Sequence, residues 1–149
     1  MSERIVVFGF FAQEIADLAE ALSKRPPRST RVEVISGSTP SAERVAIRRR
    51  FRDTEGHPER TVLVAQIKTL SLAVNELVTA SHAIFGSLSQ QRDDYVQARD
   101  RLNRIGQERP VTFWHAVAPG TVDAVILQSH RERTNLETAM LRHIRGEGS

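Results

Sequence analysis

The sequence predicts a single α/β domain, with a parallel sheet covered by helices on both faces. Short apolar stretches alternate with amphipathic helical patterns along the whole chain, and this alternation is typical of parallel strands joined by right-handed crossovers. The 149 residues, 40% of them hydrophobic, are enough for one core. No linker, repeat or low-complexity tract divides the chain, so we expect one domain over residues 1–149, with a flexible polar tail at 146–149.

Five segments have the character of strands. They are short, rich in β-branched or aromatic residues, and bounded by turn-forming residues. The segments are Arg4–Phe10, Arg31–Ser36, Thr61–Gln66, Ser81–Gly86 and Val111–Val117. The third is apolar over most of its length, as a central parallel strand should be.

Four helices are expected between and after these strands, over residues 12–24, 38–51, 91–105 and 121–144. In the second helix, Ser38 or Thr39 is expected to be the N-cap, with Pro40 near the first position. The fourth is expected to be one long closing helix. In such a fold, function belongs to the loops that follow the carboxyl ends of the strands.

Composition narrows the classes of function. The chain has no cysteine, which excludes disulfides and thiolate metal sites, and its histidines show no metal-ligand spacing. Without a signal peptide or an apolar run of membrane-spanning length, the chain is expected to be cytoplasmic. Only Lys24 and Lys68 are lysines among 21 basic side chains. Arginine suits phosphate, yet codon bias explains the preference equally well, so composition permits a nucleic-acid partner without establishing one.

The stretch QARDRLNRIGQERPV, which starts at Gln97, carries the strongest signal. On a helix, Gln97, Arg101 and Arg104 are spaced i, i+4, i+7 and share one face, and Gly106 gives the helix its exit. Two guanidinium groups on a rigid element suit a polyphosphate. A solvated face paired with nearby carboxylates is the competing interpretation.

This stretch resembles the last motif of the Swi/Snf-like branch of superfamily 2 helicases and DNA translocases. The resemblance continues into the following strand and helix. It is carried by Gln97, Arg101, Arg104, Ile105, Gly106, Gln107, Val111, Gly120 and Thr121.

Three upstream blocks extend the resemblance over nearly the whole chain. They are Phe8–Phe11, then Gly37, Ser38, Arg44 and Phe51, and then Asn75, Leu77, Thr79 and Ala80. The resemblance therefore implies the second RecA-like domain of such a motor.

Several positions depart from the family pattern. Ser71 and Ala73 stand where the family has glycines, which restricts close approach of the backbone. Residues 65–66 are Ala-Gln in place of Ser-Thr, and residues 90–92 replace Trp-Asn-Pro.

The resemblance also implies roles for individual residues. Arg101 and Arg104 would contact the γ-phosphate of ATP across an interdomain cleft, positioned by Gln97. Asn75, Gly106 and Gln107 would couple that cleft to DNA. The residues expected near the DNA backbone are Gly37, Ser38, Arg44 and Lys68.

The phosphate-binding half of such a motor is missing from the sequence. The chain contains no Gly-Lys dipeptide for a phosphate loop and no Asp-Glu pair to hold Mg²⁺. We therefore expect no ATP hydrolysis by the chain alone, and ATP and Mg²⁺ held mainly by a first RecA-like domain on another chain or in a missing segment. A stand-alone, non-catalytic module that binds nucleic acid or regulates is the alternative.

Overall fold

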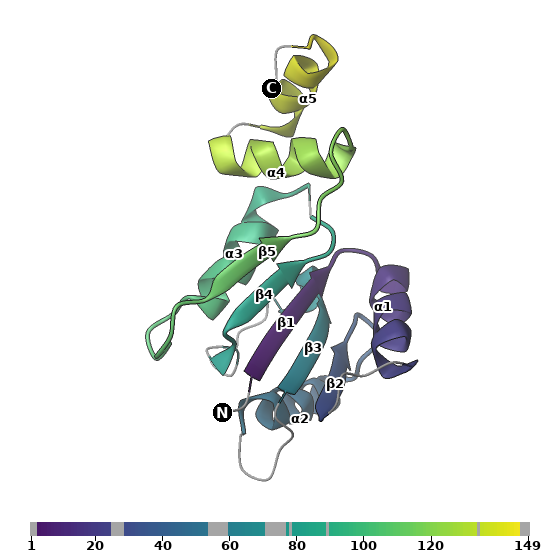
Figure 1. Cartoon of the computed structure of the whole chain (residues 1–149), viewed down its shortest axis with the longest axis vertical. Coiled ribbons are helices and arrows are strands. Elements are labelled where there is room, and N and C mark those ends of the chain that lie inside the picture. The colour runs from purple at the N-terminus through teal and green to yellow at the C-terminus, as the bar shows by residue number, and fades with distance from the viewer. Residues whose placement is uncertain are drawn as a thin grey trace.

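The computed structural model of the chain describes residues 3–24, 29–53, 60–70, 77, 79–88, 90–133 and 135–146. Its centre is a five-stranded sheet in the order β2-β3-β1-β4-β5, with every neighbouring pair parallel (Figure 1). The strands are β1 Glu3–Gly9, β2 Thr30–Ile35, β3 Arg60–Gln66, β4 His82–Phe85 and β5 Thr112–His115. The predicted strands and the parallel α/β class are confirmed.

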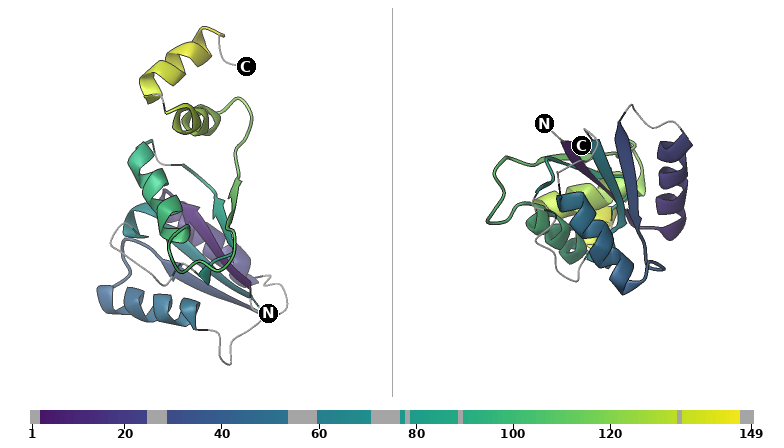
Figure 2. Two further views of the ribbon diagram at one scale, coloured as in Figure 1. Left: turned by 90° about the vertical axis from the view of Figure 1, so that its left-hand side faces the viewer. Right: turned by 90° about the horizontal axis from the view of Figure 1, so that it is seen from below.

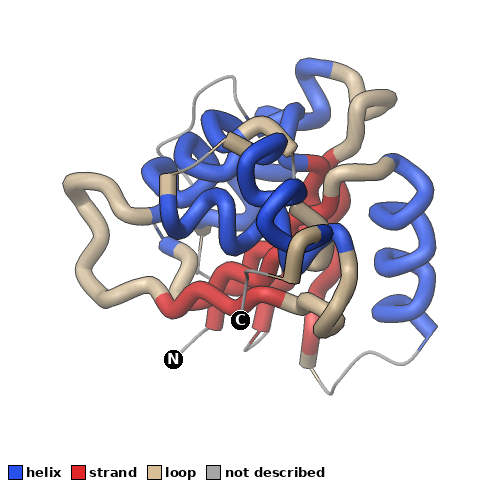
Figure 3. The backbone as a smooth tube through the Cα atoms, turned by 90° about the horizontal axis from the view of Figure 1, so that it is seen from above, coloured by secondary structure: helices blue, strands red, loops and turns tan. Residues whose placement is uncertain are grey.

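The helices are α1 Ala12–Lys24, α2 Ser41–Arg52, α3 Arg92–Leu102, α4 Val122–Glu132 and α5 Leu136–Ile144, with a short 3₁₀ helix η1 at Ile67–Leu70. Viewed from the α5 end, α1 stands alone on one side of the strands, and the other helices gather on the opposite side (Figure 3). A second view shows the same two layers (Figure 2). The prediction of helices on both faces is confirmed.

The two faces of the sheet are covered to different extents. The larger core lies between the sheet and α2, α3 and α4, and it contains Phe8, Phe51 and Phe85, all without solvent exposure. On the other face, Ile15 of α1 packs against the β1–β3 side of the sheet. Within the part of the chain that the structure describes, no helix covers the β4–β5 side of this face, and Trp114 of β5 is 55% exposed.

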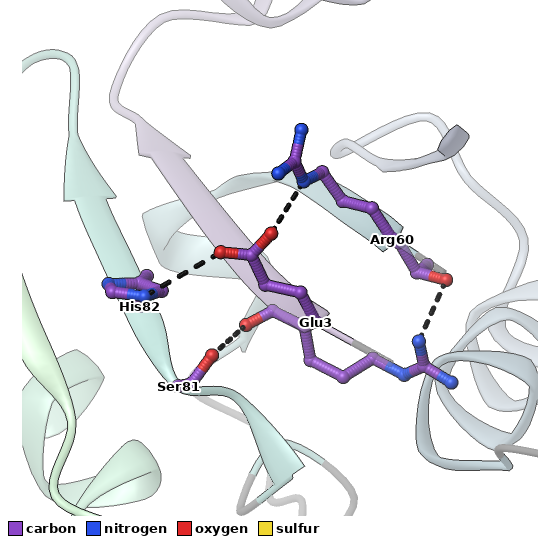
Figure 4. Close-up of polar contacts among 6 residues, drawn as sticks. Glu3, Arg60, Ser81 and His82 are labelled. Atoms are coloured by element: carbon purple, nitrogen blue, oxygen red, sulfur yellow. Dashed lines mark hydrogen bonds and ion pairs between the residues drawn. The ribbon is translucent and has the colours of Figure 1, made fainter. Parts of the chain in front are cut away.

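A row of polar contacts crosses this partly covered face near the start of the strands (Figure 4). The Glu3 carboxylate accepts a hydrogen bond from Arg60 Nε at 2.6 Å and lies 3.7 Å from His82 Nε2. Trp114 Nε1 donates to His82 Nδ1 at 3.4 Å. The row therefore links β3, β1, β4 and β5 in the order of the sheet.

A buried arginine joins the end of α2 to the sheet. Arg4 is 2% exposed, and its Nε donates to the Phe51 carbonyl oxygen at 2.7 Å. Its Nη2 donates to the Asp53 carbonyl at 3.0 Å and its Nη1 to Thr61 Oγ1 at 3.2 Å. Burial lowers the pKa of Arg4, and the charge of Arg31 lowers it further. The guanidinium therefore satisfies carbonyls at the end of α2 that have no partner within the helix.

The prediction of one long closing helix is wrong. The chain leaves α4 through Arg133 at φ 56°, and a new helix begins after Asn135, whose side chain accepts the Thr138 N–H at 2.7 Å. Asparagine at this N-cap position starts α5 as a separate helix. α5 packs on α4 beyond the carboxyl edge of the sheet (Figure 1).

The predicted cap of α2 is also wrong. Pro40 occupies the N-cap position without a side-chain hydrogen bond. The Thr39 hydroxyl accepts the Ser36 N–H at 3.0 Å instead, so it stabilises the loop before the helix. Of the tail expected at 146–149, only Gly146 is among the described residues.

Candidate nucleotide and DNA interface

The topology separates the candidate site residues into two groups. Gly37, Ser38 and Lys68 follow the carboxyl ends of β2 and β3. The second group lies at the end of α3, which starts beyond the carboxyl end of β4 and runs back along the sheet (Figure 1). Gln107, just beyond the end of α3, donates to the carbonyl of Ala80, which precedes β4. The arginines therefore lie toward the amino edge of the sheet, opposite the first group.

The carboxyl-edge cluster, as we name Phe10, Gly37, Ser38, Arg44, Gln66 and Lys68, is built around one glutamine. Gln66 Nε2 donates to the Phe10 carbonyl oxygen at 3.1 Å, and Gln66 Oε1 accepts the Gly37 N–H at 3.0 Å. A single side chain at the end of β3 thus fixes the loops that follow β1 and β2. This bond occupies the Gly37 N–H. The next residue of the loop, Ser38, is exposed.

Arg44 holds the same loop from within α2. Its Nε donates to the Thr39 carbonyl at 2.7 Å, and its Nη2 donates to the carbonyls of Ser36 at 3.2 Å and Gly37 at 3.0 Å. These bonds direct the guanidinium toward the protein backbone. Arg44 thus shapes the Ser36–Thr39 loop, and its predicted contact with DNA stays a prediction.

Lys68 is exposed in η1, and its Nζ lies 5.4 Å from the centre of the Phe10 ring. Phe11, the residue after Phe10, is 62% exposed, and its ring meets that of Phe10 edge-on with centroids 5.0 Å apart. The carboxyl-edge cluster therefore presents a cation and aromatic surface side by side.

Ser87 fixes the other side of this surface. Its hydroxyl accepts the Phe10 N–H at 2.8 Å and donates to the Glu14 carboxylate at 2.5 Å. A Cβ added to Gly86 would lie 2.9 Å from Glu14 Oε1, so glycine makes room for this carboxylate. The bond ties the start of α1 to the loop after β4.

The arginine turn, by which we mean Arg101, Arg104, Gly106 and Gln107, differs from the predicted arrangement. The helix was expected to reach residue 105, but α3 ends at Leu102, with Asn103 as its C-cap. Arg104 therefore lies in the turn and does not share a helical face with Gln97 and Arg101. Gln97 is exposed on α3, as expected of a residue outside the core.

Arg101 lies in the last turn of α3, and Arg104 lies in the turn that follows. Burial lowers the pKa of Arg101, and the charge of Arg104 lowers it further. Arg101 remains protonated at neutral pH because arginine titrates far above it. Arg99 has another role, since its guanidinium lies over the rings of Tyr95 and Phe113, 5.6 and 5.1 Å from their centres.

Gln107 anchors the turn to the sheet. Its Nε2 donates to the carbonyls of Ala80 at 2.9 Å and Leu102 at 3.1 Å. Gly106 adopts φ +104°, a conformation that side chains rarely take, and a Cβ there would meet nothing within 4 Å. Glycine is thus required by the backbone and not by crowding. Ile105, which precedes Gly106, is fully exposed.

Asn75 falls outside the described residues, together with Ser71 and Ala73. Leu77 and Ala80 at the end of this block are completely buried. Sequence reasoning missed the roles of Gln66 and Ser87. Gln66 was visible only as a departure from the family pattern, and no motif marks Ser87.

Among the described residues, no cluster of three metal-ligating side chains could hold a metal ion. None of the helices that the structure describes is long and apolar enough to cross a membrane.

Comparison with known proteins identifies the family. Residues 1–106 match the helicase conserved C-terminal domain. The chain belongs to this helicase family. It is a C-terminal RecA-like domain of the Swi/Snf-like type in superfamily 2.

Curated relatives support this assignment. The chain is 32% identical over 99% of its length to a DNA (cytosine-5-)-methyltransferase DMT5 of Cryptococcus neoformans, covering 6% of that protein. It is 28% identical over 84% of its length to the DNA annealing helicase and endonuclease ZRANB3 of Bos taurus, covering 11%. It is 29% identical over 81% of its length to the SWI/SNF-related regulator of chromatin subfamily A-like protein 1 of Xenopus laevis, covering 12%. The chain therefore spans only a small part of each.

The fold also matches a solved structure. The crystal structure of the C-terminal part of the Fun30 ATPase domain superposes with a TM-score of 0.73 at 23% identity, covering 89% of this chain and 40% of that one. The likeness establishes the RecA-like fold.

Proposed function

We propose that this chain is the C-terminal half of an ATP-dependent DNA helicase or translocase. Arg101 and Arg104 would contact the γ-phosphate of ATP, and Gln97 would help to position them. A first RecA-like domain, on another chain or in a segment outside this sequence, would hold the nucleotide. A cytoplasmic location remains a prediction from sequence.

The observation that carries the proposal is the placement of Arg101 in the last turn of α3 and of Arg104 in the turn that follows. Burial lowers the pKa of Arg101, and the charge of Arg104 lowers it further. A polyphosphate placed against them would relieve this repulsion and satisfy donors in a fork geometry suited to phosphate oxygens. In phosphoryl transfer, arginines placed in this way stabilise the charge of the transition state.

ATP and Mg²⁺ would be shared unequally between this chain and the first RecA-like domain. The described residues offer guanidinium groups for phosphate but no carboxylate cluster for a divalent cation. We expect Mg²⁺ to be held by the first domain, where it would supply positive charge that offsets the charge of the phosphates. Gly106 and Gln107, with Asn75, would couple the cleft to DNA.

DNA would pass along the carboxyl edge of the sheet. Ser38 and Lys68 are exposed there, and Gln66 and Arg44 fix the loop that carries Gly37 and Ser38. A rigid loop with a hydroxyl, beside a cation, suits a phosphodiester backbone. The carboxyl edge is also where ligands bind in parallel α/β sheets.

The first experiment is a pull-down from native extract with this chain as bait. We expect recovery of a polypeptide that carries a phosphate loop and an acidic metal-binding pair. ATP turnover of the reconstituted pair is then measured in the presence of DNA, with Arg101→Ala as the test variant. Arg142→Ala is the matched control, because Arg142 is an exposed arginine of α5, far along the chain from the arginine turn.

We expect Arg101→Ala to lower ATP turnover by about 10³-fold or more, the range found for arginine fingers, and Arg142→Ala to leave it unchanged. Equal turnover in the Arg101→Ala and unmodified proteins would contradict the assignment.

A stand-alone nucleic-acid-binding module is the second candidate. Its support is that Gln66 and Arg44 fix the loop that carries Ser38, which is exposed at the carboxyl edge together with Lys68. Recovery of DNA alone from the extract, with no partner that carries a phosphate loop, would favour this module over the split motor.

A further inference from the structure

We propose that Phe11 is a stacking platform for an unpaired base of a DNA strand at the carboxyl edge. The inference rests on the proposed binding of DNA there, and it adds a residue and a ligand class: single-stranded nucleic acid with an accessible base. Nothing in the family resemblance assigned a role to this side chain.

The backbone around Phe11 is held from three elements. The Phe10 N–H donates to Ser87 Oγ at 2.8 Å, and the Phe10 carbonyl accepts from Gln66 Nε2 at 3.1 Å. The Phe11 carbonyl accepts the Ile15 N–H at 3.2 Å and so begins α1. The position of this aromatic is therefore fixed before any ligand arrives, which reduces the entropy lost on binding.

The two rings have different surroundings. Phe10 is half-buried, and its ring meets that of Phe11 edge-on at 5.0 Å and 89°. Phe11 is 62% exposed. A phenylalanine so exposed contributes little to the core, whereas its flat face offers apolar area to a partner that can stack on it. Phe10 supports the ring without covering it.

The charges beside Phe11 favour a nucleic acid over an apolar protein segment. Lys68 Nζ lies 5.4 Å from the Phe10 ring centre, and the Gly37–Ser38 loop is joined to Phe10 through Gln66. The nearby carboxylate of Glu14 accepts a hydrogen bond from Ser87 at 2.5 Å. A cation for phosphate next to an aromatic face for the base is the combination used by proteins that bind single strands.

The test measures the affinity of the full chain for an oligodeoxythymidine and for a duplex of the same length. The variants are Phe11→Leu, which keeps apolar volume but loses the ring, and Phe11→Trp, which keeps a stacking face. Ile144→Ala is the matched control, because Ile144 is an exposed apolar residue on α5. Exposure of Phe11 means that none of these changes disturbs the core.

We expect Phe11→Leu to weaken binding of the single strand by about 5-fold to 100-fold, the range that base–aromatic stacking gives. Phe11→Trp and Ile144→Ala should bind like the unmodified chain. Duplex binding should change far less, because its bases are already stacked. A strand with 5-iododeoxyuridine should cross-link to residue 11 on irradiation, and Phe11→Leu should lose the cross-link.

The outcomes separate this inference from the proposed function. Failure of the unmodified chain to bind either probe would contradict DNA binding itself. Binding by the unmodified chain that Phe11→Leu leaves unchanged would overturn the platform alone. If Phe11→Leu spares DNA binding but weakens association with the first RecA-like domain, Phe11 belongs to the domain interface and the inference is wrong.

Discussion

The carboxyl-edge cluster and the arginine turn are built in different ways. In the cluster, Gln66 and Arg44 hold two loops through five hydrogen bonds to backbone groups. In the turn, Gln107 donates hydrogen bonds to the carbonyls of Ala80 and Leu102, and Ile105 projects fully into solvent. The cluster therefore holds two loops of the domain together, whereas the turn places an apolar side chain on the surface.

Because of this difference, we expect substitutions in the two regions to change different measurable properties. Changes in the arginine turn should affect ATP turnover by the reconstituted motor and leave the isolated domain intact. Changes in the carboxyl-edge cluster should affect loop stability and DNA affinity, and both can be measured on the isolated chain.

The largest effect is expected from Arg101→Lys. Lysine keeps the charge but loses the planar fork that matches phosphate oxygens. We expect turnover by the reconstituted pair to fall by about 100-fold or more, a large part of the effect of removing an arginine finger. DNA affinity of the isolated chain, measured by anisotropy, should not change. A parallel loss of DNA affinity would show that the two regions are not separable.

Gln66→Ala should have the next largest effect. It removes the partners of the Phe10 carbonyl and the Gly37 N–H, and each lost bond costs about 0.5–1.5 kcal/mol of unfolding free energy. Urea denaturation measures the loss. Gln66→Glu is the matched variant: it keeps an acceptor for the Gly37 N–H but sets a carboxylate oxygen against the Phe10 carbonyl, so it should be destabilised at least as much as Gln66→Ala at neutral pH. A Gln66→Glu variant more stable than Gln66→Ala would show that the bond to Gly37 outweighs the loss at Phe10.

Gly106→Ala is expected to cost about 1 kcal/mol, because alanine at positive φ is strained while its Cβ meets open space. Hydrogen exchange should show the loss in the arginine turn and not in the carboxyl-edge cluster. Gly106→Asn should cost less, since asparagine tolerates positive φ better. A similar cost for both would point to a steric cause.

The smallest effect is expected from Lys68→Ala. One phosphate contact should be lost, so the slope of log affinity against log salt should fall by about 0.7 for a single strand. Unfolding free energy should stay the same, because Lys68 is exposed. An unchanged salt slope would remove Lys68 from the DNA track.

Much of the fold was predictable because its signals are local. The strands are short apolar stretches, and each helix that packs on the sheet has an apolar stripe. The break between α4 and α5 was missed because the apolar pattern on both sides suggested continuity, whereas one capping bond from Asn135 and the positive φ of Arg133 decide it. A single local bond can outweigh a pattern that extends over several turns.

The site residues stay a prediction, and the predicted geometry of the arginines was wrong. Sequence spacing placed Arg104 on a helix that in fact ends at Leu102, so Arg104 lies in the turn that follows. The role of Gln66 depends on strand order, because β3 lies between β2 and β1 only in the folded sheet. The hydrogen bonds from Arg44 to backbone carbonyls depend on the path of the Ser36–Thr39 loop, and no sequence motif predicts that path.

The partly covered face of the sheet also supplies an optical probe. Trp114 is the chain's single tryptophan, and it stands on that face, on β5, with its indole N–H close to His82. Its emission therefore reports on one defined surface, remote in sequence from Phe11. A blue shift on adding another polypeptide would mean that this face has been covered, whereas DNA bound at the carboxyl edge should leave the emission maximum where it is. A single fluorescence measurement could thus distinguish a partner that covers this face from a ligand that binds at the carboxyl edge.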